Sequence, residues 1–112
     1  MHLKELCKQA HQISRTHGFW GAFGRDLNTH KAYYVHNRND GEMIALMHSE
    51  LSEALEALRQ TNKNKNNVGE ELADCCIRIF DYCEGRNINL EKEIITKLKK
   101  NENRPILHGK EF

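Results

Sequence analysis

Residues 41–86, GEMIALMHSELSEALEALRQTNKNKNNVGEELADCCIRIFDYCEGR, decide the fold. Apolar residues recur there at helical spacing in two runs, which the polar stretch TNKNKNN at 61–67 separates. The first run predicts a helix over 42–60 with a core stripe of Ile44, Met47, Leu51, Leu55 and Leu58. The second predicts a helix over 68–84 with a core stripe of Val68, Leu72, Cys76, Ile79 and Cys83. Because the loop between them is short, the two helices are expected to pair antiparallel.

The ends of these helices carry recognisable signals, and two more helices flank them. Asn67 and Glu70 form a variant of the capping box, and Gly85 ends the second run. Asp40 is expected to cap the first run, and Asn89 a last helix over 90–102 that turns Leu90, Ile94 and Leu98 inward. A first helix over 2–17, ended by Gly18, follows from the spacing of Leu3, Leu6, Ala10 and Ile13.

The sequence therefore predicts one all-α domain over residues 1–112, built on a four-helix core. The segment 18–41 has no sustained period and is interpreted as a long loop, ordered by the aromatic residues Phe19, Trp20, Phe23, Tyr33 and Tyr34. A chain of this length buries a thin core, so association with further copies would help to stabilise it.

Composition limits the kinds of partner. The 17 basic and 16 acidic side chains nearly cancel, so no global field favours a nucleic acid polymer or a membrane. No apolar run approaches the roughly 20 residues that span a bilayer, and the N-terminus lacks a signal-peptide pattern, so a cytoplasmic location is expected. The four cysteines, Cys7, Cys75, Cys76 and Cys83, lack metal-binding spacing and are interpreted as reduced core thiols.

Each central helix carries two carboxylates three residues apart, Glu50-Leu-Ser-Glu53 and Glu71-Leu-Ala-Asp74. Residues at this spacing are neighbours on a helix surface, so each pair points to one side. An antiparallel pair of helices brings the four carboxylates within reach of each other. In a partly dry site they would repel one another unless a cation neutralised them.

The chemistry of the ligands indicates which cation. Carboxylate oxygens without histidine or cysteine favour Mg²⁺, or Mn²⁺, over Zn²⁺. The alternative from spacing alone is two solvated acidic faces with no metal. The side of the first central helix that bears Leu46, Ala54 and Ala57 next to the glutamates is expected to be covered by another subunit.

The two acidic motifs, followed by Lys97, Lys100, Asn101, Arg104, Pro105 and then His108-Gly109-Lys110, resemble the MazG-like all-α nucleoside triphosphate pyrophosphohydrolases. The resemblance covers residues 42–112 well and the first helix loosely. In the commonest form of the family's first motif another acid precedes Glu50, where this chain has Ser49.

The resemblance implies a homodimer or homotetramer and Mg²⁺-dependent cleavage of nucleoside triphosphates to monophosphates and pyrophosphate, removing unwanted nucleotides. Glu50, Glu53, Glu71 and Asp74 would be the metal ligands and catalytic residues. Lys97, Lys100, Asn101 and Arg104 would contact phosphate and sugar, and His11 and Trp20 the base. A helix surface position for His11 and a core position for Trp20 remain open alternatives.

The expected mechanism is attack of a metal-activated water on the α-phosphorus, with one carboxylate as general base; Glu53 is one candidate. The absence of a G-x-x-x-x-G-K-[ST] motif argues against a P-loop enzyme. One rival is a related all-α hydrolase, such as a dUTPase-like or phosphoribosyl-ATP pyrophosphohydrolase. The other is a non-catalytic helical interaction module of the antitoxin kind.

Overall fold

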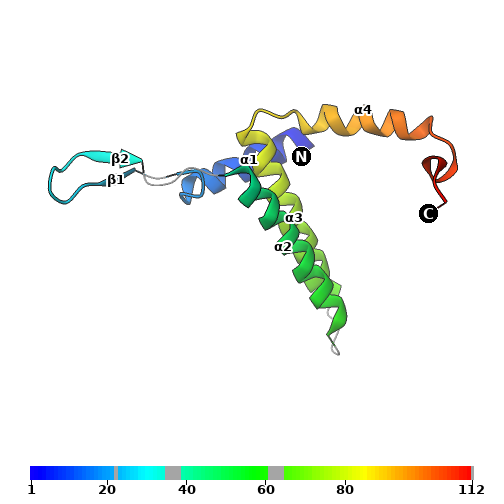
Figure 1. The fold of residues 1–112 in the computed structure, drawn as a ribbon, viewed down its shortest axis with the longest axis horizontal. Coiled ribbons are helices and arrows are strands. Elements are labelled where there is room, and N and C mark those ends of the chain that lie inside the picture. Colours follow the sequence, from blue (N-terminus) through cyan, green and yellow to red (C-terminus); the bar gives the residue numbers. More distant parts are fainter. Residues whose placement is uncertain (22, 35–38, 61–64, 112) are drawn as a thin grey trace.

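The computed structural model describes residues 1–21, 23–34, 39–60 and 65–111 (Figure 1). Its elements are α1 (Leu3–Thr16), β1 (Phe23–Arg25), β2 (Ala32–Tyr34), α2 (Asp40–Arg59), α3 (Lys65–Gly85), α4 (Leu90–Glu102) and a final 3₁₀ helix η1 (Ile106–Gly109). Four α-helices thus account for most of the chain, as the sequence predicts. No helix in the described part of the chain is both long and apolar enough to cross a membrane.

The helix ends follow the local sequence closely. Asn89 caps α4 by accepting a hydrogen bond from the Lys92 backbone N–H at 3.1 Å. Gly18 takes a positive φ of 83°, which stops α1 without strain. Two details differ from the prediction. Asn39 rather than Asp40 caps α2, and α3 begins at Lys65, so the capping box expected at Asn67 lies inside the helix. Residues 61–64 of the expected polar loop lie outside the described residues.

The helices α2 and α3 pack antiparallel along their length, and α1 crosses the end of α3 (Figure 1). The contacts are made by small side chains. Among the residues that the structure describes, the buried apolar ones are Cys7, Ala10, Met43, Ala54, Ala57, Cys75 and Cys83. Alanine and cysteine extend little from the backbone and so allow the helices to approach, and the Cys75 thiol of α3 donates to the Met47 backbone carbonyl of α2 at 3.6 Å. Three cysteines are therefore core thiols as predicted, but Cys76 is exposed. Consecutive residues of a helix point about 100° apart, so Cys76 faces away from the side on which Cys75 is buried.

The core stripe predicted on α2 is wrong. Leu51, Leu55 and Leu58 keep 48%, 55% and 51% of their surface exposed, and α3 is instead covered by Met43, Glu50, Ala54 and Ala57. At 3.6 residues per turn the buried face is rotated by roughly a quarter turn from the predicted one. Within one chain, Ala54 and Ala57 therefore do not need another subunit to cover them. The large leucines of α2 therefore face solvent, and Leu72 on α3 is likewise 46% exposed.

The helix α4 does not join the other three in a four-helix core. It touches α1 where it begins and then projects away from the α2–α3 pair (Figure 1). Ile94 and Leu98, expected inward, are 40% and 57% exposed. The chain is accordingly elongated, with a radius of gyration of 18.7 Å, against the roughly 13 Å of a compact domain of this length.

The segment expected as a long loop contains a short antiparallel β-hairpin. Phe23 pairs with Tyr34 and Arg25 with Ala32. Asp26 closes the turn by accepting the backbone N–H groups of Asn28 and Thr29, both at 2.8 Å. The hairpin projects from the body of the chain (Figure 1). No alternation longer than three residues marks these strands, so the sequence pattern could not reveal them.

Candidate metal centre

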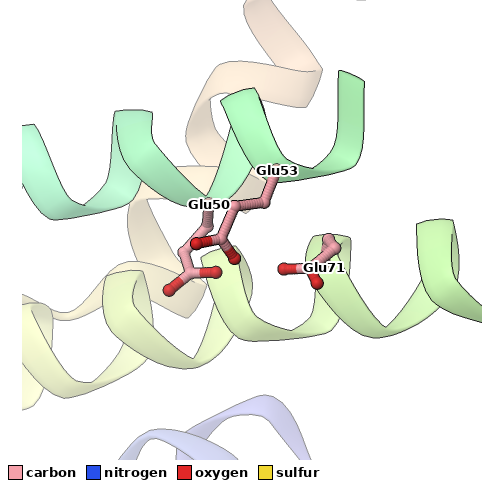
Figure 2. Close-up of side chains that lie close together, drawn as sticks. All are labelled: Glu50, Glu53 and Glu71. Atoms are coloured by element: carbon pink, nitrogen blue, oxygen red, sulfur yellow. The ribbon is translucent and has the colours of Figure 1, made fainter. Parts of the chain in front are cut away.

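Three of the four predicted carboxylates converge between α2 and α3. Glu50 and Glu53 reach down from α2 while Glu71 reaches across from α3 (Figure 2). One carboxylate oxygen of each lies within 4.8 Å of those of the other two. Among the described residues, this is the group of potential ligands close enough to share an ion, and it contains neither histidine nor cysteine.

The cluster is unevenly buried, and two of its oxygens lack partners. Glu50 is 7% exposed, whereas Glu53 faces solvent and Glu71 is half-buried. Glu50 Oε1 accepts a hydrogen bond from Arg78 Nε at 2.8 Å. Three side-chain oxygens among the described residues are buried with no hydrogen-bond partner. Two of them, Glu50 Oε2 and Glu71 Oε2, belong to this cluster, and the third is Asn101 Oδ1 on α4. A buried carboxylate oxygen without a donor is costly, so both oxygens favour a cation beside them.

The electrostatics of the cluster are strongest at Glu71. Its pKa is raised from 4.5 to about 7, first by a hydrogen bond shared with Glu53 and then by desolvation. The negative charges of Glu53, Asp74 and Glu50 raise it further. In the absence of a cation the cluster thus holds a proton that an isolated glutamate would release.

This pKa predicts the pH dependence of the metal-free protein. Because the folded chain binds the Glu71 proton more tightly than the unfolded chain, the free energy of unfolding should fall as pH rises from about 4.5 to about 7. Glu71→Gln cannot titrate, so the variant should lose this part of the decline. Urea unfolding in a chelating buffer at several pH values measures both proteins. Parallel pH profiles would contradict the assignment.

Asp74 lies beside the cluster rather than within it. It is exposed, and it lines a groove of about 370 Å³ together with Glu50 and Arg78. The groove runs between α1 and α3 and is bordered further along by Ile13, Phe19 and Asp81. Its size lies within the range of small-molecule sites. Carboxylates thus line one part of it, and the exposed ring of Phe19 another.

His11 and Trp20, the predicted base contacts, meet on the buried carboxylate of Asp81. His11 Nδ1 lies 2.9 Å from Asp81 Oδ1, and the indole N–H of Trp20 donates to the same oxygen at 2.6 Å. The two rings meet edge to face with centroids 4.9 Å apart. Trp20 also packs on Gly85, where any Cβ would collide with the indole. The guanidinium of Arg86 lies 5.2 Å from the ring centroid.

These contacts show that Trp20 packs into the body of the chain. Both rings are linked to the groove through Asp81, which lines it, whereas His11 itself lines a separate pocket with Arg15 and Glu84. The hydrogen bonds to Asp81 tie α1 and the residues after it to α3 across 70 and 61 positions of sequence.

The basic residues predicted to bind phosphate are not brought to the carboxylates by a single chain. Lys97, Lys100, Asn101 and Arg104 lie on or just after α4, which projects away from α2 and α3 (Figure 1). Lys97, Lys100 and Arg104 are exposed. Arg104 Nη1 lies 3.0 Å from His108 Nδ1 of η1, an exposed contact between residues four apart in sequence.

Sequence reasoning missed the roles of Arg78 and Asp81. A signal for both is present, because Glu71, Asp74, Arg78 and Asp81 follow one another at steps of three, four and three residues. This spacing places them along one side of α3. The charges of alternating sign that continue the acidic motif could therefore have been assigned to the same site.

Comparisons of the chain with protein-family models, curated proteins and solved structures found no match. The candidate site therefore rests on its own residues and geometry.

Proposed function

We propose that this protein is a MazG-like nucleoside triphosphate pyrophosphohydrolase that uses Mg²⁺ to cleave (d)NTP to (d)NMP and pyrophosphate. The observation that carries the proposal is the convergence of Glu50, Glu53 and Glu71 within 4.8 Å. The arrangement of the four acidic residues along two antiparallel helices agrees with the resemblance drawn from the sequence. The role in the cell would be removal of unwanted or excess nucleotides.

The donor set fits a hard divalent cation. All available ligand atoms are carboxylate oxygens, and two of them are buried without a partner. Opposite oxygens on one Mg²⁺ lie about 4.2 Å apart. Small rotations of the glutamate side chains would bring a cluster 4.8 Å wide to that spacing. Mn²⁺, which prefers the same ligands, would also fit.

The residues around such an ion would have different roles. Bound there, Mg²⁺ would activate water for attack on the α-phosphorus and neutralise phosphate charge. Glu50 would be the fixed ligand, because it is the most buried of the three. Glu53 is exposed and is a candidate to accept the proton of the attacking water. The base would extend along the groove toward Phe19, His11 and Trp20.

A homodimer or homotetramer is part of the proposal. The apolar stripe of α2, defined here as Ile44, Leu51, Leu55 and Leu58, is 41–55% exposed in one chain. Monomeric proteins rarely leave contiguous apolar strips of this kind open to water. A second copy packed there would also be the source of Lys97, Lys100, Asn101 and Arg104, since the chain's own α4 projects away from the α2–α3 pair (Figure 1).

The direct test is a panel of nucleoside triphosphates and related diphosphates, with release of pyrophosphate measured in Mg²⁺ and in chelator. We expect turnover with at least one (d)NTP that requires Mg²⁺ or Mn²⁺. Selective cleavage of dUTP, or of phosphoribosyl-ATP, would reassign the chain to a related all-α hydrolase. No metal-dependent cleavage of any member would overturn the proposal.

The exposed apolar stripe also supports a second candidate, a non-catalytic helical module that binds another protein in the manner of an antitoxin. Such a module has no need for unpartnered buried carboxylate oxygens, so the metal centre favours the enzyme. The same substrate panel separates the two.

A further inference from the structure

Arg78 occupies the position where the metal centre and the groove meet. It lies on α3 four residues after Asp74, and its side chain lines the groove beside Asp74 and Ile77. Its Nε donates to Glu50 Oε1 at 2.8 Å. The Arg78 side chain is 35% exposed, whereas that of Glu50 is 9% exposed. One end of the ion pair is therefore buried and the other open to a ligand in the groove.

The ion pair with Arg78 occupies Oε1 of Glu50, the most buried of the three proposed metal ligands. The Arg78 guanidinium supplies the positive charge that pairs with Glu50. A divalent ion at the cluster would supply that charge instead and would repel the guanidinium. The two cations therefore compete for Glu50.

We propose that Arg78 is an internal counter-cation of Glu50, which a divalent metal displaces and which then binds a phosphate group of the ligand in the groove. The inference rests on the proposed function and adds to it a residue that couples the metal to the anion. A guanidinium suits this role because its planar N–H groups can bind a phosphate through two hydrogen bonds. Nothing needs to move far, since Arg78 already lines the groove.

This coupling predicts that a single variant, Arg78→Gln, binds the metal more tightly and the phosphate ligand more weakly. Arg78→Gln removes the competing charge, so Mn²⁺ alone should bind about fivefold more tightly than to the wild-type protein. The same variant should bind inorganic pyrophosphate, in the presence of saturating Mn²⁺, about tenfold more weakly. Electron paramagnetic resonance of free Mn²⁺ measures the first affinity, and calorimetry the second.

Arg59→Gln is the matched control. Arg59 also pairs with a glutamate, Glu56, at 3.3 Å, but both side chains are exposed and the pair lies on the surface of α2. Removing this charge should leave both affinities unchanged. If Arg78 merely holds Glu50 in place, Arg78→Gln should weaken Mn²⁺ binding, which would overturn the inference. Unchanged affinities in Arg78→Gln would overturn it equally.

A measurement on the wild-type chain covers the case in which Arg78→Gln does not fold. The Arg78 Nε–Hε group should exchange slowly with water while it donates to buried Glu50, and faster once Mg²⁺ saturates the site, as seen by NMR. Unaltered exchange would refute displacement of Arg78 while leaving the metal site standing. A wild-type protein that binds neither Mn²⁺ nor Mg²⁺ would instead remove the proposed function and this inference together.

Discussion

Replacing Glu50, Glu53 or Glu71 by glutamine, or Asp74 by asparagine, is expected to lower Mg²⁺-dependent pyrophosphate release by a hundredfold or more, which corresponds to about 3 kcal/mol of transition-state stabilisation. Each substitution keeps the side-chain volume and removes one negative charge. If these residues were only solvated acidic positions, the same changes would leave activity unaltered and alter stability by less than ~0.5 kcal/mol.

The stabilities of the metal-free variants should differ from one another. Glu71→Gln and Glu53→Gln relieve repulsion within the cluster, so these chains should be as stable as the wild type or more stable near neutral pH. Glu50→Gln leaves Arg78 without its carboxylate, so it should lose about 1 kcal/mol of unfolding free energy. Urea unfolding in chelator measures these differences.

Glu70→Gln is the control for both measurements. Glu70 precedes Glu71 on the same helix but is exposed and lies outside the cluster. It should retain wild-type turnover and stability. Full activity in all of the cluster variants would refute the metal centre, whereas a loss that spares Glu70→Gln would assign it to these carboxylates.

Charging the apolar stripe of α2 is expected to produce the second large effect. Leu51→Lys combined with Leu55→Lys should convert a dimer or tetramer at micromolar concentration into monomer, because two buried charges would then lie in the interface. In a protein that is monomeric to begin with, both leucines are about half exposed, and the change would cost little. Sedimentation equilibrium distinguishes the two results.

Ala45→Lys is the control for the charged stripe. Ala45 is exposed on α2 but lies on a different side of the helix from Leu51 and Leu55. The Ala45→Lys variant should sediment with the same oligomeric mass as the wild-type protein. A wild-type chain that sediments as a monomer while cleaving nucleotides at full rate would show that the stripe is not an interface between copies.

The four α-helices and the acidic motifs were accessible to sequence reasoning because they depend on local signals. Helix periodicity, Asn89 as a cap and Gly18 as a stop act within a few residues. The pairing of α2 with α3 follows from their short connection, and that pairing brings Glu50 and Glu53 to Glu71. These conclusions need no knowledge of the remainder of the fold.

The packing faces were not accessible in the same way. The helix α2 carries two apolar stripes, one of Met43, Ala54 and Ala57 and one of larger leucines. Hydrophobicity alone assigns the larger residues to the core. In the chain, the smaller ones face α3 because they allow the backbones to approach. Periodicity cannot show which of two stripes faces a helix of the same chain. The prediction for α4 was wrong for a similar reason. Periodicity identified Ile94 and Leu98 as its apolar side, but that side is exposed in the single chain.

The packing of Trp20 gives the protein an optical reporter of its own site. It is the single tryptophan of the chain, so one indole dominates the fluorescence of the whole molecule. That indole touches His11 and Asp81, and Asp81 borders the groove. A ligand that disturbs the Asp81 carboxylate changes the polarity and the hydrogen bonding around the emitting ring. The occupancy of the groove can therefore be followed by emission from the unlabelled wild-type protein.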